Sequence, residues 1–208
     1  YNTFMKVTMK SILILAGLIS LPFFSIAQSN PDNFIDDQAQ AMVNIIRTNQ
    51  NLYLSDPEQF KSKINTIFEP MVDFRRVGAS VMGIKYYRAA TKEQRLRFIS
   101  VFKASLLDTY SSTLAQWGDQ TIETKYSQKV VFNKNEDVNQ SLITSNNIYP
   151  ITYKVRNDGM GNWLIINIIV DGVNLGLIFR NRFRALALEH DENIDDIINN
   201  WTSDANLE

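Results

Sequence analysis

The sequence predicts a single α+β domain in which several helices pack on one side of a curved, mainly antiparallel sheet of four or five strands. Apolar residues recur at helical spacing from residue 31 to about 117, alternate at strand spacing from about 121 to 170, and return to helical spacing after 175. Helices, then consecutive strands, then helices are typical of a meandering sheet covered by helices.

Three helices are expected in the first part of the chain. The first follows Pro31 and carries one apolar face, formed by Ile35, Ala39, Met42, Val43 and Ile46. The second begins at Asp56, an N-cap residue followed by Pro57, and its apolar face is Phe60, Ile64, Ile67 and Phe68. A third, short helix is predicted from Asp73 to about Gly83.

The longest helix has the clearest beginning. Thr91 and Gln94 form a capping box, in which each side chain bonds the backbone amide of the other. Large residues then recur every four positions, namely Phe98, Phe102, Leu106, Tyr110 and Leu114. Gly118 is expected as the first residue beyond the helix.

The strands are predicted from alternation and from turn residues. We expect strands at Ile122–Tyr126, Val130–Phe132, Val138–Thr144, Tyr149–Val155 and Trp163–Val170. Asn133–Asp137 is predicted to be a polar turn, and Asn157–Asn162 a hairpin loop. The Trp163–Val170 segment is apolar at nearly every position, which predicts burial of both its faces. Two final helices are expected at about 175–186 and 193–201.

The N-terminal segment resembles a secretory signal peptide. Lys6 and Lys10 precede the apolar run Ile12–Phe24, and Ser25-Ile26-Ala27 supplies the small residues of a cleavage site. The run would span roughly 20 Å as a helix, which is too short for a hydrocarbon core of about 30 Å. We therefore expect a signal peptide at residues 1–27, a mature domain at 28–203, and an exported protein.

Composition excludes several function classes. Removing residues 1–27 takes two lysines from the 21 Lys and Arg of the chain, which leaves 19 against 22 Asp and Glu, a net charge near −3. This balance argues against a nucleic-acid partner. The chain has no cysteine and one histidine, so thiol nucleophiles and two-histidine metal sites are excluded. We expect no cofactor and no metal.

The charged residues that remain have two interpretations. The acid pairs Asp36-Asp37, Glu136-Asp137 and Asp195-Asp196 could serve acid–base catalysis, but their places at helix starts or in a polar turn favour a structural role. His190 lies in a charged stretch and is interpreted as a solvated residue. Arg180, Arg182 and Arg184 either form a solvated helix face or contact a lipid phosphate or an acidic partner.

Two long stretches resemble the MlaC (toluene-tolerance) family of periplasmic phospholipid carriers. The first runs from Asp73 to Tyr110, and its matching residues are Asp73-Phe74, Met82-Gly83, Tyr86-Tyr87-Arg88, Ala90-Thr91, Glu93-Gln94, Phe102 and Tyr110. The second runs from Asn162 to Phe183, with matches at Trp163, Asp171-Gly172-Val173, Leu175, Arg180 and Phe183. The chain departs from the family pattern at Asn167, Asn174 and Phe179, where Asp, Ser and Tyr are usual.

The resemblance implies a cone-shaped, NTF2-like domain that binds phospholipid and is not an enzyme. It further implies a monomeric shuttle that helps to maintain outer-membrane lipid asymmetry. Its partners would be an outer-membrane lipoprotein–porin complex and an inner-membrane ABC transporter with an MCE-domain subunit. A diacyl lipid exposes about 30 methylenes worth about 0.8 kcal/mol each, so the carrier needs a dry cavity near the upper end of roughly 300–1,000 Å³.

The alternation of side chains along the predicted strands then indicates which residues line the cavity. Leu164, Ile166, Ile168 and Val170 would share one face, away from Asn167. We expect Ile151, Tyr153, Ile166 and Ile168 to contact acyl chains, with Phe102, Leu106 and Tyr110 facing them. The alternative is that this face packs a closed core. Arg180, Arg182 and Arg184 are the candidate docking surface for a membrane partner.

Two other functions remain open from the sequence. One is an isomerase with a buried acid on a similar scaffold, although an amide at Asn167 is a poor general base. The other is a periplasmic chaperone or adaptor that binds apolar peptide segments.

Overall fold

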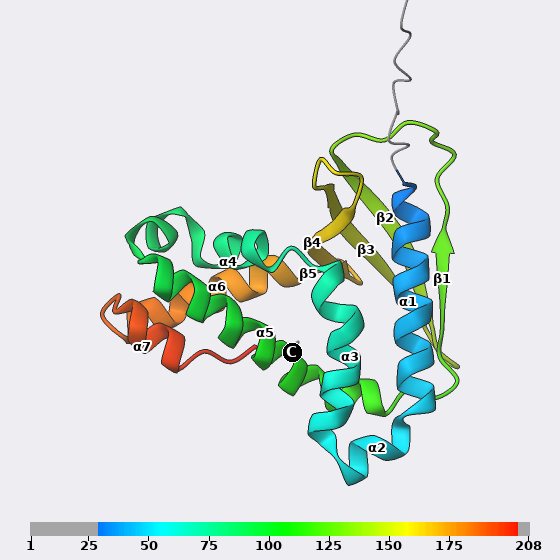
Figure 1. Cartoon of the computed structure of the whole chain (residues 1–208), viewed down its shortest axis with the longest axis horizontal. Helices are drawn as coiled ribbons and strands as arrows, with labels where there is room; N and C mark the ends of the chain where they lie inside the picture. The colour runs from blue at the N-terminus through cyan, green and yellow to red at the C-terminus, as the bar shows by residue number, and fades with distance from the viewer. Residues whose placement is uncertain (1–28, 204–208) are drawn as a thin grey trace, which may run out of the picture.

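The computed structural model describes residues 29–203, which contain seven helices and one antiparallel sheet in the strand order β1-β2-β3-β4-β5 (Figure 1). The predicted α+β class is confirmed. The segment proposed as a signal peptide, residues 1–27, lies outside the described residues.

The first two predicted helices are present, and a side chain caps the beginning of each. In α1 (Pro31–Thr48) the Asn30 side chain accepts from the Asp32 amide at 2.8 Å. In α3 (Pro57–Met71) Asp56 accepts from the Gln59 amide at 2.9 Å. The short helix α2 (Gln50–Ser55) joins them and was not predicted, because it buries no residue and therefore has no apolar period.

A kink and a capping box shape the next two helices. α4 (Phe74–Ala89) is broken at Gly83, whose φ of 70° is non-helical, so the end predicted there is a kink and a further helical turn follows. α5 (Lys92–Ala115) begins with the predicted capping box of Thr91 and Gln94. It ends with Gln116 as C-cap, so Gly118 is not the first residue beyond the cap.

The sheet is built from consecutive strands, which are β1 (Thr121–Lys125), β2 (Asn135–Ile143), β3 (Ile148–Asn157), β4 (Trp163–Val170) and β5 (Val173–Asn174). The predicted strand Val130–Phe132 is wrong, because Val130 and Val131 are 91% and 80% exposed and pair with no strand. The predicted turn Asn133–Asp137 is also partly wrong, since Glu136 and Asp137 pair with β3 inside β2.

A β-bulge interrupts β4. Lys154 pairs with Asn167 and Val155 with Ile165, which leaves Ile166 without an opposite residue. An inserted residue shifts the alternation of side chains along a strand. Tyr153 therefore pairs with Ile168, and the uninterrupted alternation expected from Leu164 to Val170 does not hold. Trp163 and Ile165 are fully buried, while the other β4 residues are half-buried.

Two hydrophobic cores result from this arrangement. α1 and α3 lie against the sheet, whereas α4, α5, α6 (Leu175–Glu189) and α7 (Ile194–Asn199) gather beside it (Figure 1). The helical core contains Phe98, Phe102, Phe183 and Trp201, whose rings contact one another. The sheet core is smaller and consists of Ile35, Met71, Val138, Val155, Trp163 and Ile165.

Candidate functional site

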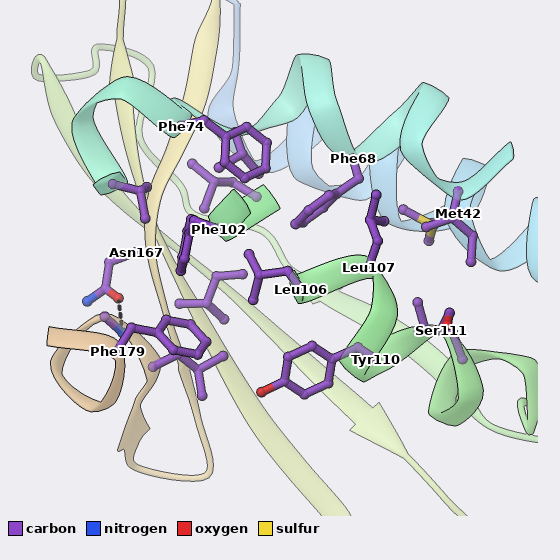
Figure 2. A pocket seen from close by; sticks show the side chains of 18 residues that line it. Met42, Phe68, Phe74, Phe102, Leu106, Leu107, Tyr110, Ser111, Asn167 and Phe179 are labelled. Carbon is purple, nitrogen blue, oxygen red and sulfur yellow. Dashed lines mark hydrogen bonds between the residues drawn. The ribbon is translucent and has the colours of Figure 1, made fainter. Parts of the chain in front are cut away.

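An apolar cavity of about 230 Å³ lies where the two cores meet, and we call it the main cavity. Phe74, Phe102 and Phe179 reach it from the helical core, and Ile165 reaches it from the sheet core. Its complete lining is Met42, Ile64, Phe68, Val72, Phe74, Val77, Phe102, Leu106, Leu107, Tyr110, Ser111, Leu114, Ile165, Asn167, Ile168, Leu175, Gly176 and Phe179 (Figure 2). No charged side chain is part of this lining.

The predicted residues of α5 come together at this cavity. Phe102, Leu106 and Tyr110 are four residues apart, so one face of the helix presents all three to the main cavity (Figure 2). The same face adds Leu107 and Leu114, which the sequence analysis did not single out as cavity residues. Their position could have been found from the same helical spacing.

A second apolar cavity, of about 220 Å³, adjoins the first. The two share Met42, Phe68, Val72, Leu114, Ile165 and Ile168. The second cavity extends along the buried face of α1 and contains Tyr153. Both volumes are below the range of roughly 300–1,000 Å³ that we expected for a lipid cavity. The apolar space is therefore divided into two small chambers rather than one large one.

The sheet residues that were predicted to contact acyl chains do not all line the same cavity. Ile168 lines both cavities, and Tyr153 lines the second, where burial raises the pKa of its phenol to about 12. Ile151 is buried opposite Val170 but does not line either cavity. Ile166 borders a polar hollow instead, because the bulge separates it from Ile168.

Asn167 joins the bulged strand to the beginning of α6. Its Oδ1 accepts from the Gly176 amide at 3.0 Å (Figure 2). Its Nδ2 donates to Asn174 Oδ1 at 3.0 Å. Asn174 also caps α6 by accepting from the Leu177 amide at 3.1 Å. A Cβ on Gly176 would lie 2.5 Å from Asn167 Oδ1, so only glycine permits this approach. Asn167 and Asn174 were noted from the sequence as departures from the family pattern, but their contact and the role of Gly176 were not predicted.

Two polar hollows lie outside the apolar cavities. The one that Ile166 borders, here called the polar hollow, measures about 560 Å³ and also contains Lys154 and Arg180. The other, here called the arginine hollow, measures about 510 Å³ and contains Arg180, Arg184 and the exposed Leu188. Arg182 borders neither, because it lies about 200° around α6 from Arg180. The predicted cluster of three arginines is therefore divided between two flanks of the helix.

At least one acid of each pair is engaged in a structural bond. Asp36 accepts from the Thr124 hydroxyl at 2.6 Å, and Asp195 accepts from Arg97 at 2.6 Å and from Gln94 at 3.0 Å. Glu136 accepts from Lys129 and from the Asn133 amide. In residues 29–203, no group of three His, Cys, Asp or Glu side chains could hold a metal ion, and no helix is long and apolar enough to cross a membrane. The two apolar cavities therefore offer a ligand mainly apolar contacts.

Comparison with known proteins identifies one matching family and two related sequences. The profile of the MlaC protein family matches residues 36–203. The toluene tolerance protein ttg2D of Pseudomonas putida is 31% identical over 193 residues, covering 92% of this chain and 88% of that protein. The intermembrane phospholipid transport system binding protein MlaC of Haemophilus influenzae is 23% identical over 154 residues, covering 73% of this chain and 72% of that protein.

A solved structure has the same fold. The phospholipid-binding protein of Ralstonia solanacearum, determined in complex with a phospholipid, superimposes with a TM-score of 0.74. The match covers 82% of this chain and 94% of the other, at 18% sequence identity.

Proposed function

Because this chain belongs to the MlaC family, we propose that it binds a phospholipid with the acyl chains in the two apolar cavities. The observation that carries the proposal is the lining of these cavities, in which no described residue is charged. Burial of about 30 methylenes would stabilise the complex by roughly 25 kcal/mol before ordering costs are subtracted. The Haemophilus influenzae relative is named a phospholipid transport binding protein, and the structural neighbour was determined with a bound phospholipid; both agree with this proposal.

The small volumes of the cavities bear on how the lipid is held. The two cavities share six lining residues, among them Met42 and Phe68. Methionine is unbranched and adapts readily to its surroundings. We propose that rearrangement of these side chains joins the two chambers when acyl chains enter, while the headgroup remains in water because an unpaired buried phosphate is costly.

The wider role that we propose is transport rather than catalysis. The chain would act in the periplasm as a soluble shuttle between an inner-membrane MCE-domain ABC transporter complex and an outer-membrane lipoprotein–porin complex. Such transport would help to maintain outer-membrane lipid asymmetry. The arginines of α6 are our candidates for contact with these partners.

The test compares two glutamates on adjacent residues of β4. Ile168→Glu places a charge against both apolar cavities, whereas Ile169→Glu places it on the opposite face of the strand, where Ile169 pairs with Thr152. We expect Ile168→Glu to retain less than about a tenth of the wild-type lipid, because a charge in hydrocarbon is strongly unfavourable. Ile169→Glu should retain lipid nearly as the wild type does.

Native mass spectrometry of freshly purified protein measures the retained lipid. Circular dichroism confirms that each variant is folded. A folded Ile168→Glu protein that carries the normal amount of phospholipid would refute the assignment of the cavity. A wild-type protein that carries no lipid would contradict the proposed function itself.

A further inference from the structure

Helices α3 and α5 line the main cavity together (Figure 2). α3 contributes Ile64 and Phe68, and α5 contributes Leu106 and Leu107 among others. Phe68 also lines the second apolar cavity. A movement of α3 away from α5 would therefore open the main cavity and displace a side chain that both cavities share.

Two ion pairs join these helices, and we call them the α3–α5 pairs. Lys61 Nζ lies 2.6 Å from Asp108 Oδ1, and Lys103 Nζ lies 2.7 Å from Glu69 Oε1. Along both helices, the four cavity residues named above fall between one pair and the other. The pairs therefore bracket the part of the α3–α5 contact that encloses the main cavity.

The α3–α5 pairs lie at the surface, because Asp108 and Glu69 are both more than half exposed. Exposed ion pairs are individually weak, and salt screens them. Such pairs hold two helices together at little cost to their separation. This property suits a closure that has to open.

The two ends of α3 are held differently. At its C-terminal end, Val72 bridges to Ile165 of β4, and the Asp73 amide donates to the Ile165 carbonyl at 2.9 Å. At its N-terminal end, α3 follows α2, which buries no residue. Phe60 of α3 contacts the Tyr53 ring of α2, so these two helices can move together. Val72 is therefore the natural pivot for a movement of α3.

We propose that α3 is a lid on the main cavity, which pivots at Val72 and is held closed by the pairs Lys61–Asp108 and Lys103–Glu69. Acyl chains then enter and leave between α3 and α5 when both pairs break. This inference rests on the proposed function and assigns an entry route to it.

The lid affects the rate of exchange rather than the affinity. None of the four paired side chains lines either apolar cavity, so the pairs would hold the lid closed with and without cargo. Weakening them would lower the barrier to opening and leave the contacts of the cargo unchanged. An ordinary structural role would not give this separation of rate from occupancy.

The first experiment breaks both α3–α5 pairs by combining Lys61→Gln with Lys103→Gln. The control combines Lys85→Gln with Arg97→Gln, which removes the same charge and breaks two exposed pairs that do not join α3 to α5. Each protein is loaded with dioleoyl phosphatidylcholine and mixed with vesicles of the deuterated lipid, which carry no net charge. Native mass spectrometry follows exchange with time, and circular dichroism confirms folding.

We expect the variant without the α3–α5 pairs to exchange lipid about three- to tenfold faster than the wild type, as the combined effect of two exposed ion pairs, at nearly unchanged occupancy. Added salt should accelerate exchange by the wild type, because it screens the pairs, and should have less effect on this variant. The control variant should exchange lipid at the wild-type rate.

The second experiment holds the lid closed. The chain contains no cysteine, so Lys61→Cys combined with Asp108→Cys supplies a unique pair of thiols. A short bismaleimide joins them after lipid has been loaded, and the single-cysteine variants treated in the same way are the controls. Cross-linking should slow exchange well below the wild-type rate, whereas the same variant before cross-linking should exchange at least as fast as the wild type.

Three outcomes would count against the inference. Unchanged exchange after cross-linking would place the entry route elsewhere. Equal exchange rates for the two glutamine double variants would show that the α3–α5 pairs do not hold a lid closed. Faster exchange with a matching loss of occupancy would indicate a general loosening of the fold. A wild type that carries no phospholipid before or after contact with vesicles would instead refute the proposed function.

Discussion

Tyr153 places a phenol in the wall of the second cavity, on the strand next to the bulge. Burial raises the pKa of this phenol to about 12, whereas an unfolded chain titrates near 10. Below pH 10 both states are protonated, and the contribution of Tyr153 to stability is fully present. Between about pH 10 and 12 the unfolded chain loses its proton first, so stability falls as pH rises.

We predict that Tyr153→Phe removes this loss. Between pH 9 and pH 12, the free energy of unfolding of the wild type should fall by up to about 2–3 kcal/mol more than that of the variant. Urea unfolding across this pH range measures the free energy of unfolding of both proteins. The other tyrosines are present in both, so their contributions cancel in the difference. Identical slopes for the wild type and Tyr153→Phe would contradict the prediction.

Single residues also show which positions could be predicted from the sequence and which could not. Helical spacing was sufficient to bring Phe102, Leu106 and Tyr110 to the main cavity. The alternation expected in β4 was not sufficient, because a nearly continuous apolar run gives no sequence signal of a bulge. Ile166 therefore borders the polar hollow instead of an apolar cavity. The arginines of α6 were grouped by proximity in sequence, although helical geometry already divides Arg180 and Arg184 from Arg182.

At the scale of elements, Glu136 holds the connection between β1 and β2. It is buried inside β2, yet it accepts from Lys129 and Asn133 in the preceding loop. Burial alone would raise the pKa of Glu136, but the bonds from Lys129 and Asn133 outweigh it and lower this pKa. The carboxylate therefore stabilises the fold at neutral pH, and this contribution is lost as pH falls through the lowered value.

Glu136→Gln is expected to lower the free energy of unfolding at pH 7 by about 1–3 kcal/mol, since it leaves a buried amide opposite Lys129. Hydrogen exchange of residues 127–133 should become faster. Asp137→Asn provides the comparison, because its exposed pair with Lys154 is worth less than about 1 kcal/mol. If the two variants lose the same stability, Glu136 does not organise this loop.

The elements that sequence analysis found are those with caps or a sustained period. Thr91 and Gln94 marked the start of α5, and Asp56 marked the start of α3. The short β5 (Val173–Asn174) escaped prediction because two residues cannot show alternation. Val130–Phe132 has a strand-like composition but no partner strand, and side-chain bonds to Glu136 hold the chain beside it instead.

The whole molecule must also release what it binds. A cargo stabilised by roughly 25 kcal/mol gross leaves only if a partner favours a state that binds it less tightly. The proposed place for such a partner is α6, where Arg182 and Arg184 are exposed on opposite flanks of the helix.

We predict that Arg182→Glu combined with Arg184→Glu slows transfer of labelled lipid to a membrane partner without emptying the cavities. The single variants then identify which flank of α6 makes the contact. A labelled-lipid exchange assay measures transfer, and native mass spectrometry measures occupancy. Unchanged transfer by the folded double variant would place docking elsewhere on the molecule.

The position of the cavities between two cores has a consequence for how this protein can evolve. Filling a void with a larger side chain usually adds dispersion contacts and raises stability. At Leu114 or Ile168, which face both cavities, such a change would remove the space that the cargo requires. Selection for binding would therefore hold these positions below their best packing, and the stability of the fold would depend more on the rest of the molecule, including the aromatic contacts of the helical core.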